Sequence, residues 1–219
     1  LPLSEITLDW QVIGNDKPSE GIKSSATKVL VVAIPNDVIR QYQEIAEQAD
    51  LEIRVLEAEA FALSRAALGE EKKVTAIIDI GARSTTCNIL EKGILKMSHS
   101  FNISGNELTE ILSRSLGIDY KEADERKKNL GLLSQGESKK NTRDIFLPLI
   151  DLILAEVKRI FQNFYQTEGK EVEKIILTGG TALMPGLKEY FSEEFGKETE
   201  IPNPFSALSY PAILDETLK

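Results

Sequence analysis

The sequence predicts a mixed α/β fold in which helices cover the faces of a mixed sheet. Paired strand-like patterns come first, long helix-like patterns follow, and a later strand ends in two glycines before another helix. The 219 residues are 42% hydrophobic and 28% charged, as in ordinary globular proteins. This length suits one large domain or two small ones.

The first part of the chain is expected to form a small α/β unit. Residues 6–14 alternate apolar and polar side chains, as a half-buried strand does, and residues 28–35 read as a fully buried strand. A helix is expected over residues 36–49, followed by a further strand over residues 51–57. Trp10 is expected to pack within this unit.

The second part opens with a buried strand over residues 74–82 and continues with two strands joined by a tight turn at residues 91–93. The remaining elements are helices over residues 105–116, 120–130 and 142–166, a strand over residues 173–178 that ends at two glycines, a helix over residues 187–195 and a short final strand. The sequence contains no internal repeat and no low-complexity segment.

Charge and composition argue against several classes of function. The formal net charge is -9 and the sequence pI is near 4.9, whereas a nucleic-acid ligand requires a basic face. The single cysteine, Cys87, excludes an internal disulfide framework, and with the single histidine, His99, it argues against a zinc site. No run of about 18 apolar residues occurs, so no direct membrane insertion is expected. The absence of a signal-peptide pattern and of an initiator Met suggests a piece of a cytoplasmic protein.

Two glycine turns carry the strongest functional signal. In the first, Asp79 ends a buried strand, Gly81 follows at a sharp turn, and small residues leave backbone amides open toward phosphate oxygens. A carboxylate beside phosphate becomes useful when Mg²⁺ lies between them, usually through water. In the second, Gly179 and Gly180 permit close approach of a flat or anionic ligand, and Pro185 fits a first helical turn. Each turn by itself is more typical of a purely structural turn than of a ligand site.

Together, in this order, the two turns resemble the second phosphate loop and the adenosine loop of the actin-like (ribonuclease H-like) ATPase superfamily. The first fits Asp-x-Gly-(Gly/Ala)-x-(Ser/Thr)-(Ser/Thr), and the second fits Gly-Gly-x-(Ala/Ser)-x-(Leu/Met)-Pro-Gly. Between them, Asp124 and Lys127 occupy positions of an Ala-Glu-x-x-Lys helix that contacts ribose and adenine, although a solvated charged helix face fits the same residues. Asp124 is one methylene shorter than the usual Glu.

The resemblance implies ATP and Mg²⁺ as ligands and no catalytic residue. It implies phosphate or Mg²⁺ contacts from Asp79, which would hold the metal through water, and from Gly81, Ala82, Arg83, Ser84 and Thr85. It implies nucleotide contacts from Gly105, Glu107, Asp124, Lys127, Gly179, Gly180, Thr181 and Met184. Arg83 has two readings, because its cation could pair with phosphate or point to solvent.

Within this superfamily, the chain resembles the PilM-like proteins of type IV pilus assembly nearly end to end. The Gly-Ala-x-x-Thr-Thr form of the first loop and the closing Asn203-Pro204-Phe205 segment favour this branch over FtsA-like proteins. The resemblance implies a partial actin-like fold with a small inserted α/β subdomain over residues 1–56, a connecting helix over residues 57–72 and the second lobe over residues 73–219. That lobe would comprise a 2A-like part, residues 73–117 and 172–219, and a 2B-like part, residues 118–171.

The family's first phosphate loop and its final helix have no counterpart in the sequence. We therefore expect a fragment that binds ATP weakly or not at all and does not hydrolyse it, because phosphoryl transfer depends on groups from both lobes.

The function that the resemblance implies is that of a cytoplasmic assembly scaffold, held at the inner membrane through its partners. ATP would act as a structural ligand or switch, and the partners would be the N-terminal peptide of a PilN-type membrane protein and other pilus platform proteins. An exposed aromatic in the first 60 residues would be a candidate for the partner site. Two alternatives remain: an FtsA-like membrane-associated filament protein, and a sugar-kinase-like phosphotransferase, which would need a positioned general base.

Overall fold

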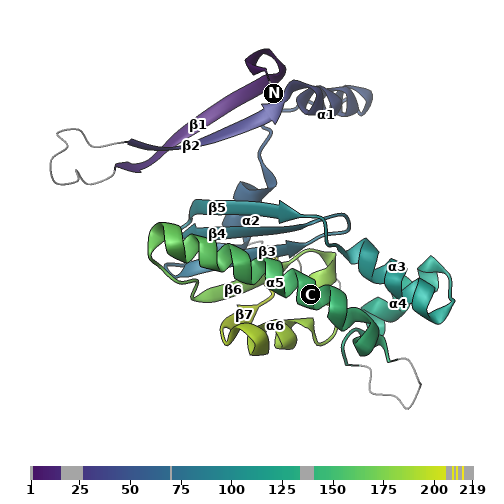
Figure 1. The fold of residues 1–219 in the computed structure, drawn as a ribbon. Coiled ribbons are helices and arrows are strands. Elements are labelled where there is room, and N and C mark those ends of the chain that lie inside the picture. Colours follow the sequence, from purple (N-terminus) through teal and green to yellow (C-terminus); the bar gives the residue numbers. More distant parts are fainter. Residues whose placement is uncertain are drawn as a thin grey trace. The chain divides into compact units, whose positions relative to one another are not determined.

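The computed structural model describes residues 2–15, 27–69, 71–133 and 141–205, together with residues 209, 211 and 214. The chain divides into two compact units, Leu1–Ala58 and Glu59–Lys219 (Figure 1). Each unit has its own sheet.

The first unit is a two-stranded ribbon followed by a helix. Strands β1 (Ile6–Asn15) and β2 (Thr27–Pro35) pair antiparallel, and α1 (Asn36–Gln48) follows directly. Alternate residues of β2 differ in exposure: Leu30, Val32 and Ile34 are half-buried, whereas Val29 and Val31 are exposed. The ribbon therefore turns one apolar face to solvent.

The strand over residues 28–35 is not fully buried as expected, since Val29 and Val31 are 43% and 58% exposed. Two further expectations for this unit are wrong. Residues 51–57 do not form a strand; they run without strand pairing, and Leu51 and Val55 are 69% and 81% exposed. Trp10 is 66% exposed instead of packed. The cause in both cases is a missing neighbour, since an alternating apolar pattern forms a buried strand only where another strand or a helix covers it.

The second unit contains a mixed sheet, as predicted, and its five strands lie in the order β5-β4-β3-β6-β7. Its strands are β3 (Val74–Ile80), β4 (Thr85–Glu91), β5 (Ile94–Phe101), β6 (Lys174–Thr178) and β7 (Glu198–Glu200). The first three pair antiparallel, and β3, β6 and β7 pair parallel. The turn between β4 and β5 has positive φ at both Lys92 and Gly93, as a tight two-residue hairpin requires.

Helices cover both faces of this sheet (Figure 1). They are α2 (Glu59–Leu68), α3 (Gly105–Leu116), α4 (Tyr120–Leu130), α5 (Thr142–Glu168) and α6 (Leu187–Phe195). Side chains alternate along β3, so Ile78 packs in the large core with Phe146 of α5, whereas Ile77 packs in a smaller core with Leu68 of α2. The apolar pattern of residues 142–166 also predicts that Leu152 is buried, but this side chain is 54% exposed on α5.

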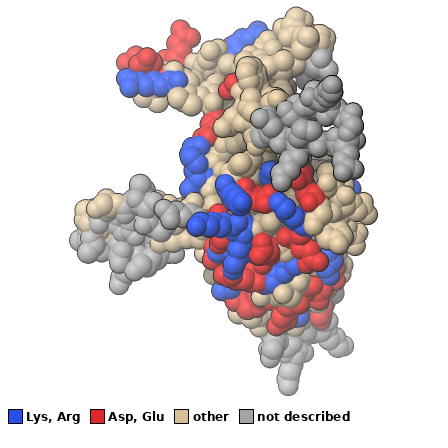
Figure 2. Space-filling model, turned by 90° about the vertical axis from the view of Figure 1, so that its left-hand side faces the viewer, with Lys and Arg blue, Asp and Glu red and all other residues tan. Residues whose placement is uncertain are grey.

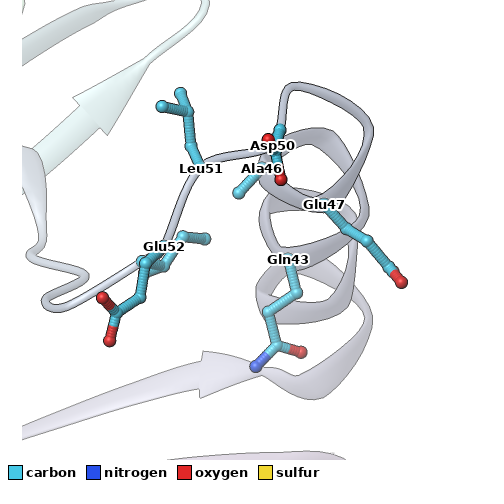
Figure 3. A pocket seen from close by; sticks show the side chains of 7 residues that line it. Gln43, Ala46, Glu47, Asp50, Leu51 and Glu52 are labelled. Carbon is cyan, nitrogen blue, oxygen red and sulfur yellow. The ribbon is translucent and has the colours of Figure 1, made fainter.

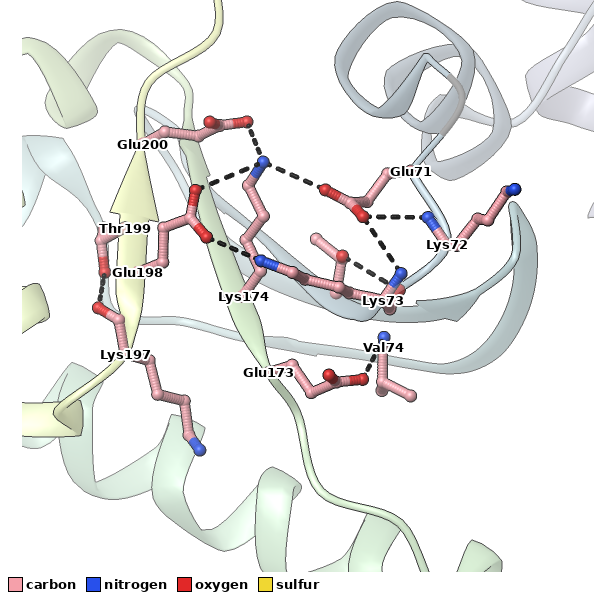
Figure 4. Close-up of polar contacts among 11 residues, drawn as sticks. Glu71, Lys72, Lys73, Val74, Glu173, Lys174, Lys197, Glu198, Thr199 and Glu200 are labelled. Carbon is pink, nitrogen blue, oxygen red and sulfur yellow. Dashed lines mark hydrogen bonds and ion pairs between the residues drawn. The ribbon is translucent and has the colours of Figure 1, made fainter.

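Charged side chains of both signs are interleaved on the face shown in Figure 2. Around the amino-terminal ends of β3, β6 and β7 they form a network centred on Lys174 (Figure 4). The Lys174 ammonium lies 2.9 Å from Glu200, 3.2 Å from Glu71 and 3.9 Å from Glu198. Burial lowers the pKa of Lys174, but its hydrogen bonds to Glu200 and Glu71 outweigh this effect and the pKa is raised. The network thus links the parallel strands β3, β6 and β7 on the side of the sheet where β3 and β6 begin.

Replacing Lys174 with Met is expected to lower the free energy of unfolding by about 1–2 kcal/mol, because carboxylates then lose their ammonium partner. Hydrogen bonds to Lys73 and Lys174 lower the pKa of Glu71. The stabilisation that the ionised Glu71 carboxylate contributes is present above the pKa that this carboxyl has in the unfolded chain. It is lost as the pH falls through the pKa that the carboxyl has in the folded protein. The variant should therefore lose less stability than wild type between about pH 5 and pH 3. Urea unfolding followed by circular dichroism measures this, and an identical pH dependence in both proteins contradicts it.

Candidate functional site

Asp79 lies where β3 meets β6, one residue before the end of β3. It is the parallel-sheet partner of Thr178, whose hydroxyl donates to Asp79 Oδ1 over 3.2 Å. Burial raises the pKa of the Asp79 carboxyl, and the hydrogen bond from Thr178 acts in the opposite direction. Within the described ranges, no three metal-ligating side chains gather at one place, so the protein would offer a cation one carboxylate here.

The loop after β3 is a tight turn with free amides. Gly81 N donates to Ser84 O over 3.0 Å and closes the turn. Among the described residues, the amides of Ala82, Arg83 and Ser84 have no acceptor, and the Arg83 side chain is exposed without a carboxylate partner. Thr85 is different: its side chain is buried and donates to Ile103 O over 2.6 Å, so it fixes the segment before α3.

The start of α3 is bound to this loop. Gly105 N donates to Gly81 O over 2.8 Å, and Asn106 N donates to Ala82 O over 3.1 Å. The Glu107 carboxylate accepts from Ser104 N over 3.0 Å and completes a capping box at the helix start. Glu107 therefore caps α3, which is a different role from the nucleotide contact that the family resemblance implies.

Helix α4 contributes a buried ammonium. Lys127, 7% exposed, donates to Gly105 O over 3.0 Å and to Thr109 Oγ1 over 2.6 Å, and lies 2.9 Å from Asp124 Oδ1. Hydrogen bonds from Lys128 and then Lys127 lower the pKa of Asp124, which keeps this carboxyl ionised. All three hydrogens of the Lys127 ammonium have acceptors within the protein.

The loop after β6 approaches the first loop closely. Gly179 has φ +84°, and a Cβ added to it would lie 2.5 Å from Asp79 Oδ1 and 2.6 Å from Ile80 O. Gly180 starts the 3-10 turn Gly180–Leu183, and a Cβ added there would meet no atom within 4 Å. Helix α6 begins at Leu187, so Pro185 precedes the helix and does not lie in its first turn as expected.

The loop after β3, the start of α3, helix α4 and the turn after β6 enclose a pocket of about 550 Å³. Its lining contains seven predicted nucleotide-site residues, namely Ala82, Gly105, Asp124, Lys127, Gly180, Thr181 and Met184. The other predicted residues lie in the same loops or in the strands and helix next to them, but outside this lining: Asp79, Gly81, Arg83, Ser84, Thr85, Glu107 and Gly179.

Sequence reasoning missed Asn106, Lys128 and Leu183, which also line the pocket. Each is adjacent to a predicted residue or lies between two of them, and this adjacency is the signal that could have found them.

A second pocket, also of about 550 Å³, lies within the first unit. Figure 3 shows Gln43, Ala46 and Glu47 on α1 opposite Leu51 and Glu52 of the following segment. Its lining is mixed and includes three acidic residues, Glu47, Asp50 and Glu52. None of the nucleotide-binding motifs in the sequence includes a residue of this pocket.

The sheet order and the meeting of the loops after β3 and β6 define an actin-like fold, and solved structures bear this out. The PilM-PilN type IV pilus biogenesis complex aligns with a TM-score of 0.78 at 24% identity, over 99% of this chain and 62% of that chain. MreB5 of Spiroplasma citri bound to ADP aligns with a TM-score of 0.62 at 19% identity, over 78% of this chain and 62% of that chain. EutJ from Carboxydothermus hydrogenoformans aligns with a TM-score of 0.58 at 28% identity, over 73% and 54%.

The family is more specific than the fold. The model of the type IV pilus assembly protein PilM family matches residues 1–218, and the chain belongs to this family. The cell division protein FtsA of Streptococcus pneumoniae is 22% identical over 227 residues, covering 93% of this chain and 49% of FtsA. FtsA of Bacillus subtilis is 25% identical over 224 residues, covering 91% and 48%. The chain thus spans about half the length of these relatives. Among the described helices, none is long and apolar enough to cross a bilayer.

The two glycines after β6 are expected to differ strongly in how much stability an alanine substitution costs. Gly179→Ala forces a Cβ against the Ile80 backbone at positive φ and should cost about 2–4 kcal/mol of unfolding free energy. Gly180→Ala meets open space and should change stability by less than about 1 kcal/mol. Urea unfolding followed by circular dichroism compares them; equal losses would show that the two loops do not pack as described.

Proposed function

We propose that this chain belongs to a cytoplasmic scaffold of the type IV pilus inner-membrane platform, with nucleotide in the second unit and a partner on the first. ATP acts in this proposal as a structural ligand or switch. The observation that carries it is the single pocket formed by the loop after β3, the start of α3, helix α4 and the turn after β6. Two similar MreB5 structures of Spiroplasma citri are bound to ADP and to AMPPNP, which supports a nucleotide ligand.

The residues that line the pocket, together with Asp79 and Ser84 beside it, suit the parts of a nucleotide. Gly180 leaves the open space that a flat base requires, and Asp124 is an ionised acceptor suited to ribose hydroxyls. The free amides of Ala82 and Ser84 suit phosphate oxygens. Asp79 would hold Mg²⁺ through water, since Mg²⁺ prefers oxygen ligands and keeps part of its hydration shell; the metal would neutralise phosphate charge.

The same residues do not favour a phosphotransferase. Among the described residues that line the pocket, Asp124 is the one carboxylate, and two lysines hold its pKa low. A general base works best with a pKa near the working pH, so Asp124 is poorly suited to deprotonate an acceptor hydroxyl. We propose weak ATP binding by this chain and no turnover. The FtsA matches favour a filament protein as the second candidate.

The first unit offers a surface for the partner. Leu8, Trp10, Val12, Val29 and Val31 are 43–66% exposed. Trp10 pairs with Val31 and Val12 pairs with Val29, and paired residues share a face, so these side chains form one apolar face of the ribbon. An exposed aromatic within such a face is typical of an interaction site. The partner in our proposal is the N-terminal peptide of a PilN-type protein, which with other platform proteins holds the chain at the membrane.

Replacing Trp10 with Ala is expected to weaken binding of a PilN-type N-terminal peptide about 10- to 100-fold, because a central aromatic carries much of an interface's energy. Stability should change little, since Trp10 is 66% exposed. Calorimetric titration measures the affinity, with Tyr165→Ala as control because Tyr165 is 55% exposed on α5. Unchanged peptide affinity in the Trp10 variant rejects this face as the docking site.

Mg-ATP is expected to bind the chain at millimolar concentration without hydrolysis. Asp124→Ala should lower the affinity about tenfold by removing a charged acceptor. Glu110→Ala is the matched control, because Glu110 also pairs with a cation at i,i+4 but lies outside the pocket lining. Ligand-observed NMR measures binding and phosphate release measures turnover. An equal loss of ATP affinity in both variants, or measurable phosphate release, would contradict the proposal.

A further inference from the structure

The start of α3 has no backbone donor left for a ligand. The amides of Gly105 and Asn106 donate to Gly81 O and Ala82 O, and the amide of Glu107 donates to the Ser104 side chain. A helix N-terminus usually offers these groups to an anion. Here the loop carbonyls and the capping box use them, and the Glu107 carboxylate adds a negative charge. Helix α3 can therefore contribute to anion binding only through a side chain.

Asn106 supplies a side chain suited to this role. It is exposed, it lines the pocket, and its Oδ1 accepts a hydrogen bond from the Tyr120 hydroxyl over 3.0 Å. An amide side chain has one acceptor end and one donor end, so with Oδ1 at the Tyr120 hydroxyl the Nδ2 group lies on the side of the amide away from this hydrogen bond. Among the described residues, Nδ2 has no acceptor. Tyr120 is the first residue of α4, so this bond also ties the starts of two helices together at the pocket.

We propose that Asn106 donates from Nδ2 to the phosphate chain of the bound nucleotide, and that Tyr120 is the positioning residue that fixes this amide. The inference rests on the proposed nucleotide function and deepens it. The phosphate end is indicated because the Asn106 backbone is bound to Ala82 O, inside the loop whose amides are free. The family motif draws attention to Gly105 and Glu107 and passes over the residue between them.

Three variants test the proposal by chemical-shift titration with Mg-ATP and, separately, with adenosine. Asn106→Ala should weaken ATP binding about tenfold and Tyr120→Phe about threefold, since a neutral donor to a charged acceptor is lost or misaligned. Adenosine binding should stay unchanged in both. Tyr165→Phe, which removes a tyrosine hydroxyl on α5 outside the pocket lining, should change neither affinity.

The outcomes separate this inference from the proposed function. If wild type binds ATP and adenosine but Asn106→Ala binds ATP equally well, the inference alone is overturned. Equal weakening of ATP and adenosine places Asn106 at the nucleoside and also overturns it. If wild type binds neither ligand, both the inference and the nucleotide proposal are overturned. Tyr120→Phe keeps the aromatic ring, so a loss specific to ATP in this variant cannot come from lost packing.

Discussion

The parallel pairing of β3 with β6 is the constraint on which the pocket depends. It sets Asp79 beside Thr178, so the loops that follow both strands leave the sheet at the same edge. The approach is close enough that only a residue without a Cβ fits at position 179. Gly105 meets a comparable limit, since a Cβ there would lie 2.3 Å from Thr181 Oγ1. The glycines are thus required first by contacts between protein segments and only then by any ligand.

The buried ammonium of Lys127 extends this arrangement to α4. Burying a charge is unfavourable unless it is fully paired, and here three oxygens, one of them a carboxylate oxygen of Asp124, surround the nitrogen. Because one acceptor is Gly105 O, α4 is tied to the same residue whose amide is bound to the first loop. The pocket walls from α3, α4 and the loop after β3 therefore share one hydrogen-bonded network.

Much of this could be predicted from the sequence because it depends on local patterns. Apolar runs ending in glycine indicated β3 and β6 and their loops, and positive φ at Lys92 and Gly93 confirms the predicted hairpin turn. The internal partners of buried polar groups could not be predicted where they come from tertiary contacts, as for Thr85 and Lys127. Nor could the sequence show that residues 51–57 lack a neighbouring strand, because strand patterning does not say what covers it.

The central claim is that the loops after β3 and β6 and the start of α3 form one nucleotide site. Residue-resolved mapping of amide chemical shifts during titration with Mg-ATP tests it most directly. The account predicts that the largest changes fall on residues 82–84, 105–106, 124 and 180–184, from four separate stretches of sequence at the same ligand concentration. Changes confined to the acidic pocket around Glu47 and Asp50, or confined to one of the two loops, would contradict it.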